Sequence, residues 1–244
     1  MARNRNSFRP NVDQFETRDC PAPVRIAIVV PQGFGDEIAL GKQIISRIAP
    51  TAKVSVVTVR HEFEALGMAA GAGRQAEVVV MPWTINSGAT KVRDLGLFRT
   101  DYVTGLGDGP VTRWPWKVKH PDTVYVAAAG DREQSRAPAN FAAVLSAGAT
   151  SGPSAQSSVV ANTTTTSEAA FVWAGLAARL VSIHGERLDT DGFARLLRRT
   201  YPQVLRGQAP NARDLVDRAH FLHHQRVLHE YQQQLYEESK VLLK

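Results

Sequence analysis

The chain of 244 residues contains a single cysteine, Cys20, so no disulfide can form within it. Its stability must therefore come from a hydrophobic core, and a reducing compartment is compatible with this composition. Residues 1–15 contain arginines but no apolar run after them, which argues against a secretory signal. No stretch reaches the roughly 18 apolar residues of a membrane-spanning helix. These absences make the cytoplasm the expected compartment.

Aromatic residues make up only 7% of the chain, and no segment interleaves them with basic residues as RNA-binding motifs do. The net charge of +6 would favour anionic partners. Arginines dispersed over an ordinary surface are the simpler interpretation of that charge. Nucleic-acid binding is therefore an option that no motif supports.

The sequence predicts neither a metal site nor a cofactor. His220 and His224 have the i, i+4 spacing of two zinc ligands on a helix, but no third ligand is apparent. No acidic cluster has the character of a calcium site. We therefore interpret these histidines as solvated side chains.

Short apolar runs alternate with segments of helical spacing through much of the chain. The runs are typical of buried parallel strands; they lie at 24–30, 54–59, 77–81, 124–129 and 144–148. Helical spacing marks 37–48 and 62–70, whereas 84–122 is irregular and 151–166 reads as a low-complexity loop. The alternation predicts an α/β fold with right-handed crossovers and a mostly parallel sheet. In such sheets ligands bind beyond the carboxyl ends of the strands.

The stretch from Thr165 to Leu180, TTSEAAFVWAGLAARL, predicts a helix that is apolar nearly all round and therefore buried. Ser167 stands at its amino end, among unsatisfied N–H groups and at the positive end of the helix dipole. This layout suits a nucleophilic serine. It also suits an ordinary helix start, because Thr165 and Glu168 have the spacing of a capping box.

Five segments, in family order, resemble the subtilases, the subtilisin-like serine proteases. Thr166 to Gly175 resembles their nucleophile helix, Gly-Thr-Ser-x-Ala-x-Pro-x-x-Ala-Gly, and VYVAAAGD at 124–131 resembles their oxyanion strand. The other similar segments are the strands at 48–59 and 141–151 and the closing helix at 184–201. The resemblance implies a three-layer subtilisin-like domain with a mostly parallel central sheet.

Most residues that carry subtilase catalysis are missing from the matching positions. No carboxylate follows the first strand, where the family has its Asp, and residues 33–41 contain no His, where the family has its base. The oxyanion Asn is replaced by Asp131, and an ionised carboxylate there would repel the developing negative charge. Ser167 and the Thr before it do match. Losing the base alone costs about a million-fold in turnover.

Two rearrangements could keep Ser167 catalytic. The related sedolisins have Asp at the oxyanion position, which Asp131 fits, and a Glu and Asp one turn apart on a helix. Asp36 and Glu37 are adjacent in sequence and so do not face one another on a helix. A replacement base is the other route: His61 follows a predicted strand, although a solvated loop histidine is the simpler interpretation.

The residues after 206 lie outside the resemblance. The stretch from Arg213 to Lys244 lacks Gly and Pro and predicts one long helix. On it Phe221, Leu228, Leu235 and Leu242 recur at intervals of seven, the spacing of a stripe that docks on a partner or pairs with its own copy. Packing back onto its own domain is the alternative.

The sequence thus predicts a polar arm at 1–22, a reduced subtilase-like domain at 23–206 and a helical extension at 207–244. We expect a domain that has lost its triad and acts as a binding or scaffolding subunit, for a protein or peptide partner or by self-association. The alternative is a serine peptidase or hydrolase with a rearranged site at Ser167, its base supplied by a partner chain.

Three surfaces are expected to make the contacts. They are the cleft near Asp131 and Ser167, the loop with Trp114 and Trp116, and the stripe from Phe221 to Leu242. Exposed Trp is a typical interface anchor, although this tryptophan pair could equally belong to the core.

Overall fold

The computed structural model describes residues 23–85, 122–131, 137–141, 143–155, 157–206 and 208–242. The strands are β1 (Arg25–Pro31), β2 (Lys53–Val59), β3 (Val78–Met81), β4 (Val124–Ala128), β5 (Leu145–Ala149) and β6 (Val159–Ala161). The helices are α2 (Gly35–Ile48), α3 (Glu62–Ala72), α4 (Thr166–His184), α5 (Thr190–Thr200) and α6 (Ala212–Leu242), with a 3₁₀ turn, η3 (Pro202–Arg206).

The strands form one parallel sheet in the order β2-β1-β3-β4-β5-β6. β1 pairs with β2 along its whole length but with β3 only from Ile26 to Ile28. Every residue of β3, β4 and β5 is buried, as expected for strands covered on both faces. The predicted α/β class and parallel sheet are confirmed.

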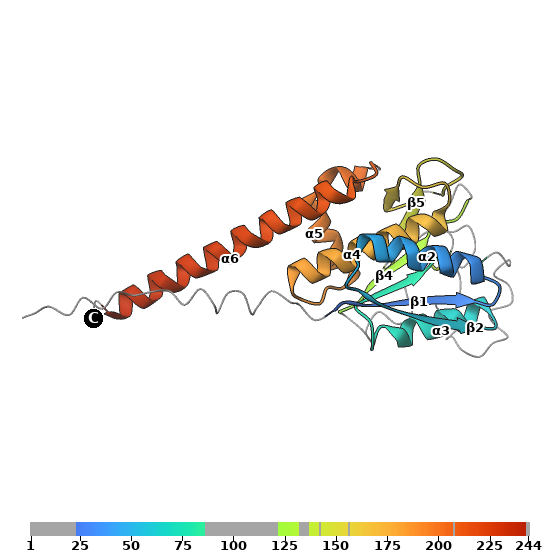
Figure 1. The fold of residues 1–244 in the computed structure, drawn as a ribbon, viewed down its shortest axis with the longest axis horizontal. Helices are drawn as coiled ribbons and strands as arrows, with labels where there is room; N and C mark the ends of the chain where they lie inside the picture. Colours follow the sequence, from blue (N-terminus) through green and yellow to red (C-terminus); the bar gives the residue numbers. More distant parts are fainter. Residues whose placement is uncertain are drawn as a thin grey trace, which may run out of the picture.

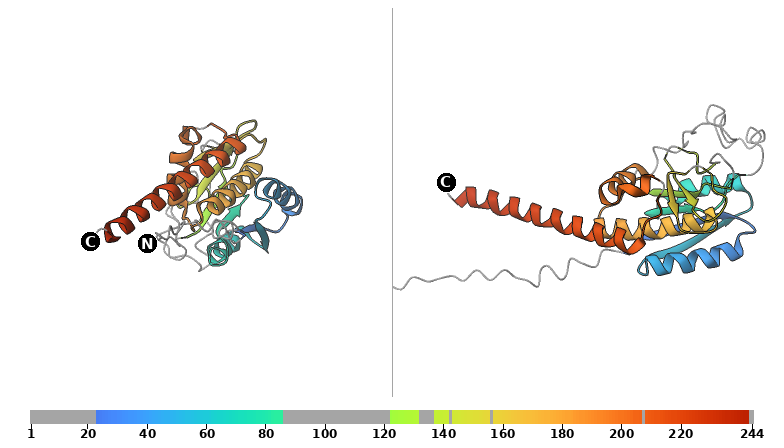
Figure 2. Two further views of the ribbon diagram at one scale, coloured as in Figure 1. Left: turned by 60° about the vertical axis from the view of Figure 1, so that its left-hand side comes forward. Right: turned by 90° about the horizontal axis from the view of Figure 1, so that it is seen from above.

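Helices cover the two faces of the sheet and make three layers. α2 and α4 pack against each other on one face, and α3 packs on β1 and β2 on the opposite face (Figures 1 and 2). Two glycines let α2 and α4 approach closely. A Cβ on Gly41 would collide with the Phe171 ring, and a Cβ on Gly175 would lie 3.0 Å from Ile48.

Two sequence predictions are corrected. The predicted loop at 151–166 contains β6, a three-residue strand whose Val159 and Ala161 are buried beside β5. The predicted closing helix at 184–201 forms as α5 but begins later than predicted, because its first predicted residue, His184, still belongs to α4. Gly185 caps α4 in the left-handed conformation, with φ 76°, and α5 then starts at Thr190.

The predicted tail helix is confirmed as α6, whose 31 residues make it about 46 Å long. Its first turns pack on α4 and α5 and bury Leu215 and Ala219. Beyond them α6 projects away from the sheet (Figures 1 and 2). Among the described residues, no helix has the length and apolar content needed to cross a bilayer.

Candidate functional site

Ser167 is the second residue of α4 and lies next to the carboxyl end of β3. Its hydroxyl donates a 2.7 Å hydrogen bond to the carbonyl oxygen of Pro82, the first residue after β3. A nucleophilic serine needs a neighbouring base to take its proton, and a backbone carbonyl cannot do so. In this geometry Ser167 ties the start of a buried helix to the end of a buried strand.

The residues around Ser167 cap the helix as predicted, except that one side chain bonds to a different residue. Thr165 is the N-cap, and its hydroxyl accepts a 3.2 Å hydrogen bond from the Glu168 backbone N–H. The Glu168 carboxylate reaches back to Thr164 rather than Thr165, accepting from its backbone N–H at 3.2 Å and its hydroxyl at 3.0 Å. Capping thus occupies the polar groups on both sides of Ser167.

The end of β4 lies beside the same helix start. The Gly130 N–H donates a 3.3 Å hydrogen bond to the hydroxyl of Thr166, and Gly130 has a left-handed φ of 91°. Asp131 therefore comes directly after a residue, Gly130, that is hydrogen-bonded to the start of α4. Its side chain is exposed, and in the described part of the chain no hydrogen bond joins it to Ser167.

A side chain after β3, Trp83, bridges to β1 at the carboxyl ends of these two strands. Strand order reverses here, since β2 lies on one side of β1 and β3 on the other, and ligands of such sheets bind at this point. The Trp83 indole donates a 2.7 Å hydrogen bond to the Val29 carbonyl and is only 3% exposed. The Val29 carbonyl lies just beyond the last residue of β1 that pairs with β3, and the Trp83 indole supplies its hydrogen-bond donor.

A depression of about 300 Å³ lies beside Ser167, between the first turns of α2 and α4. Its lining consists of Asp36, Glu37, Leu40, Thr165, Ser167, Glu168 and Phe171. Asp36 and Glu37, adjacent in sequence, thus both border the depression that Ser167 lines. Three carboxylates and two apolar side chains suit a basic or apolar group of a partner. They do not suit an oxyanion, which requires hydrogen-bond donors.

His61, the replacement base considered from the sequence, lies away from Ser167, and so does His184 at the far end of the Ser167 helix. His61 is the N-cap of α3, on the other face of the sheet, and follows the edge strand β2. His184 is the last residue of α4, about 25 Å along the helix from Ser167. In the ranges that the structure describes, no group of three His, Cys, Asp or Glu side chains could hold a metal ion.

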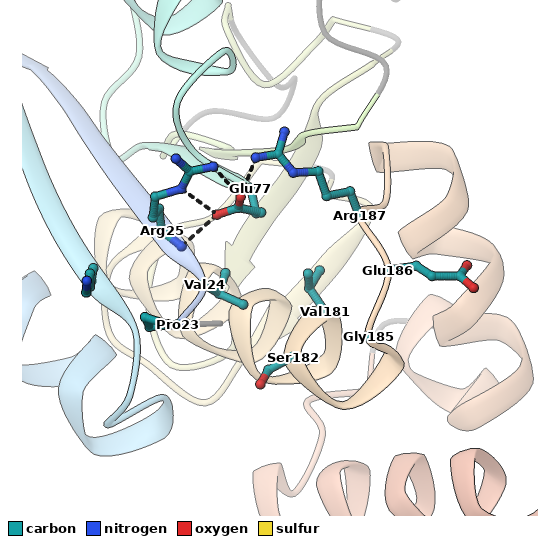
Figure 3. Close-up of a pocket in the computed structure, with 10 residues that line it drawn as sticks. Pro23, Val24, Arg25, Glu77, Val181, Ser182, Gly185, Glu186 and Arg187 are labelled. Atoms are coloured by element: carbon teal, nitrogen blue, oxygen red, sulfur yellow. Dashed lines mark hydrogen bonds and ion pairs between the residues drawn. The ribbon is translucent and has the colours of Figure 1, made fainter. Parts of the chain in front are cut away.

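A larger depression, of about 560 Å³, lies at the opposite, amino-terminal edge of the sheet (Figure 3). There Glu77 joins Arg25 and Arg187. One carboxylate oxygen accepts from Arg25 Nη2 at 2.7 Å and from Arg187 Nη2 at 2.6 Å, and the other accepts from the Arg25 backbone N–H at 2.7 Å. Burial raises the pKa of Glu77, but the hydrogen bonds and charge of Arg25, with the charge of Arg187, outweigh it and lower the pKa to about 2.

This arrangement, which we call the Glu77 clasp, was not predicted. It joins the start of β1, the residue before β3 and the loop after α4, so it fixes the amino-terminal edge of the sheet. The single Glu77 carboxylate balances only one of the two guanidinium charges, but it hydrogen-bonds to both side chains and ties three segments together, so we interpret the clasp as structural.

Of the remaining predicted contact residues, the structure describes the side chains of two. Phe221 and Leu228 are 62% and 42% exposed on α6. Leu235 and Leu242 continue the seven-residue spacing on α6, but their side chains are outside the described part. Trp114 and Trp116 lie outside the described residues altogether.

Comparison with known proteins adds no relative: no family model, curated protein or solved structure matches this chain. The subtilase resemblance therefore rests on the segments quoted from the sequence.

Proposed function

We propose that this chain is a catalytically inactive, subtilase-like protein that acts as a binding or scaffolding subunit of a protein complex. The observation that carries the proposal is the number of large apolar side chains exposed on α6. Besides Phe221 and Leu228, the helix exposes Leu222, Val227, Tyr231 and Tyr236. Apolar side chains gathered on a projecting helix mark a protein-interaction surface.

The state of Ser167 supports binding over hydrolysis. Its hydroxyl is held by Pro82, and the depression beside it is lined by carboxylates. Asp131 at the expected oxyanion position would add further negative charge. A developing oxyanion needs the opposite electrostatics. The depression can instead accept a basic or apolar side chain from a bound protein.

The experiment is affinity purification of the tagged full chain from its own cells, with co-purifying proteins, untagged copies of the same chain included, quantified by mass spectrometry. We expect Leu228→Asp to lose them, because it places a charge in the apolar surface. Gln233→Asp is the matched control, since Gln233 is exposed on the same helix outside the stripe. Ser167→Ala should keep its partners. Unchanged partners in Leu228→Asp, or lost partners in folded Ser167→Ala, would contradict the proposal.

A serine peptidase or hydrolase with a rearranged site is the second candidate. One observation favours it: Asp36 and Glu37 border the same depression as Ser167. In that case substrate or a partner chain would have to displace the Ser167–Pro82 hydrogen bond and bring a base to the hydroxyl. Covalent labelling of Ser167 separates the two candidates.

A further inference from the structure

α6 has two faces with different roles. Leu215 and Ala219 are buried against the domain, and Arg226 on the same face donates a 3.2 Å hydrogen bond to the His184 carbonyl at the end of α4. At about 100° per residue, Phe221 and Leu228 point roughly 180–200° away from Ala219. The apolar stripe therefore lies on the side of α6 that faces away from its own domain.

This geometry decides which surfaces can cover the stripe. Phe221 lies only two residues after the buried Ala219, where α6 is still docked, and yet it is 62% exposed. The α4 and α5 surfaces on which α6 docks cannot reach the opposite side of the same helix. What covers the stripe must come from beyond that docking surface.

We infer that the stripe pairs with the same stripe of a second copy of this chain. The inference rests on the proposed function and names its partner. Seven-residue spacing is the pattern with which helices pair along a seam. From 219 to 236 the only Lys, Arg, Asp or Glu residues are Arg226 and Glu230, which form a 3.7 Å ion pair on the domain-facing side. Two copies can therefore meet without bringing like charges together.

The charge pattern also favours a copy over a different helix. Partner choice between unlike helices is commonly set by charged residues that flank the seam. The flanking positions here hold His220, Gln225, Val227, Gln232 and Gln234, none of them Lys, Arg, Asp or Glu. A twofold pairing leaves each domain on the outer side of its helix, so the domains do not obstruct the seam.

We infer an antiparallel orientation. Position 238, a Glu, continues the line of His224 and Tyr231 at intervals of seven. In a parallel pair the two copies of Glu238 would face each other, which repels. In an antiparallel pair with Leu228 opposite Tyr231 of the second copy, each Glu238 lies opposite Phe221 and the two copies of Glu238 are far apart.

The first test is the molar mass of the purified full chain at micromolar concentration, from size-exclusion chromatography with light scattering. We expect twice the 26.7 kDa of one chain. Leu228→Asp should weaken the pairing on the order of 100-fold, because a charge in an apolar seam is strongly disfavoured, and should elute as a monomer. Gln233→Asp should remain a dimer. Circular dichroism checks that both variants keep their fold.

A monomeric wild-type chain, or a dimer that survives Leu228→Asp, would overturn the inference. If the wild-type chain is monomeric but the affinity purification still shows Leu228-dependent partners, only the self-pairing inference fails and the proposed function stands.

The second test measures orientation. A spin label at Lys240→Cys, in a Cys20→Ser background, reports the distance between the two copies. An antiparallel pair separates the labels by roughly 30 Å along the helix axis. A short distance, with the labels side by side, would show a parallel pair and overturn the antiparallel arrangement.

Discussion

The hydroxyl of Ser167 and the carbonyl of Pro82 are joined by a 2.7 Å hydrogen bond that links the first turn of α4 to the end of β3. The helix brings a serine to the carboxyl edge of a parallel sheet, where an α/β enzyme would use it. The hydroxyl instead satisfies a backbone acceptor, and the surrounding Thr and Glu side chains cap the helix.

Replacing Ser167 by Ala should lower the free energy of unfolding by about 1 kcal/mol, the usual net contribution of one hydrogen bond. Urea unfolding followed by circular dichroism measures it. Ser182→Ala is the control, because Ser182 lies on the same helix and no described residue hydrogen-bonds its side chain. Equal stability of the two variants would show that the Pro82 bond contributes nothing.

Trp83→Phe should lower the free energy of unfolding by about 1–3 kcal/mol. Phenylalanine leaves part of the indole volume empty and leaves the Val29 carbonyl without its buried donor. Urea unfolding again measures the loss. If the variant is as stable as the wild type, Trp83 does not bridge the ends of β1 and β3 in the manner described.

The Glu77 clasp predicts a loss of stability in acid. The folded-state pKa of Glu77 is about 2, against an ordinary value of 4.5. The clasp therefore contributes fully above about pH 4.5, and its contribution disappears as the pH falls towards 2. Glu77→Gln should destabilise the protein at pH 7 and show a smaller stability change between pH 5 and pH 3.

The control for the clasp is Glu186→Gln. Glu186 also lines the depression, but it is 69% exposed and its ion pairs are 3.9–4.0 Å long. We expect its removal to leave both the stability and its acid dependence nearly unchanged. An identical pH profile for Glu77→Gln and the wild type would contradict the role of the clasp.

The docking of α6 on α4 should weaken below neutral pH. Burial lowers the pKa of His184 from 6.5, and the charge of Arg226, with a smaller effect of His223, lowers it further against the opposing effect of Glu186. The docked state therefore prefers neutral His184. Its contribution is present above about pH 6.5 and is lost as the pH falls through that value towards the lower folded pKa.

His184→Gln should reduce the dependence of unfolding free energy on pH between 7.5 and 5, since glutamine gains no proton. His229→Gln, at an exposed position on α6, is the control and should keep the wild-type dependence. If His184→Gln also keeps it, the docking contact does not sense pH.

Continuous apolar runs made most of the fold predictable. β1, β3 and β4 are buried on both faces, so their sequences carry a clear signal. β6 was missed because its three residues follow a Ser-rich stretch and pairing with β5 alone makes them a strand. The Thr165 cap of α4 could be predicted because it depends on residues close in sequence, whereas the Glu168 carboxylate bonds to Thr164 and not to Thr165 as predicted.

The Glu77 clasp could not be read from the sequence. Glu77 lies 52 residues from Arg25 and 110 from Arg187, so only the fold brings them together. The role of Trp83 depends on the fact that β1 stops pairing with β3 at Ile28. No local sequence pattern predicts where that pairing stops. The Ser167 hydroxyl was read correctly as lying at a helix start, but its partner, Pro82, is 85 residues away.

The most direct test of the central claim is fluorophosphonate labelling of the purified full chain, alone and with lysate of its own cells, with Ser167→Ala as control. We predict no labelling above that of the variant under either condition, because the Ser167 hydroxyl is bound to Pro82 and no side chain among the described residues hydrogen-bonds it as a base. Labelling of the wild type that disappears in Ser167→Ala would show an activated nucleophile and contradict the binding-subunit account.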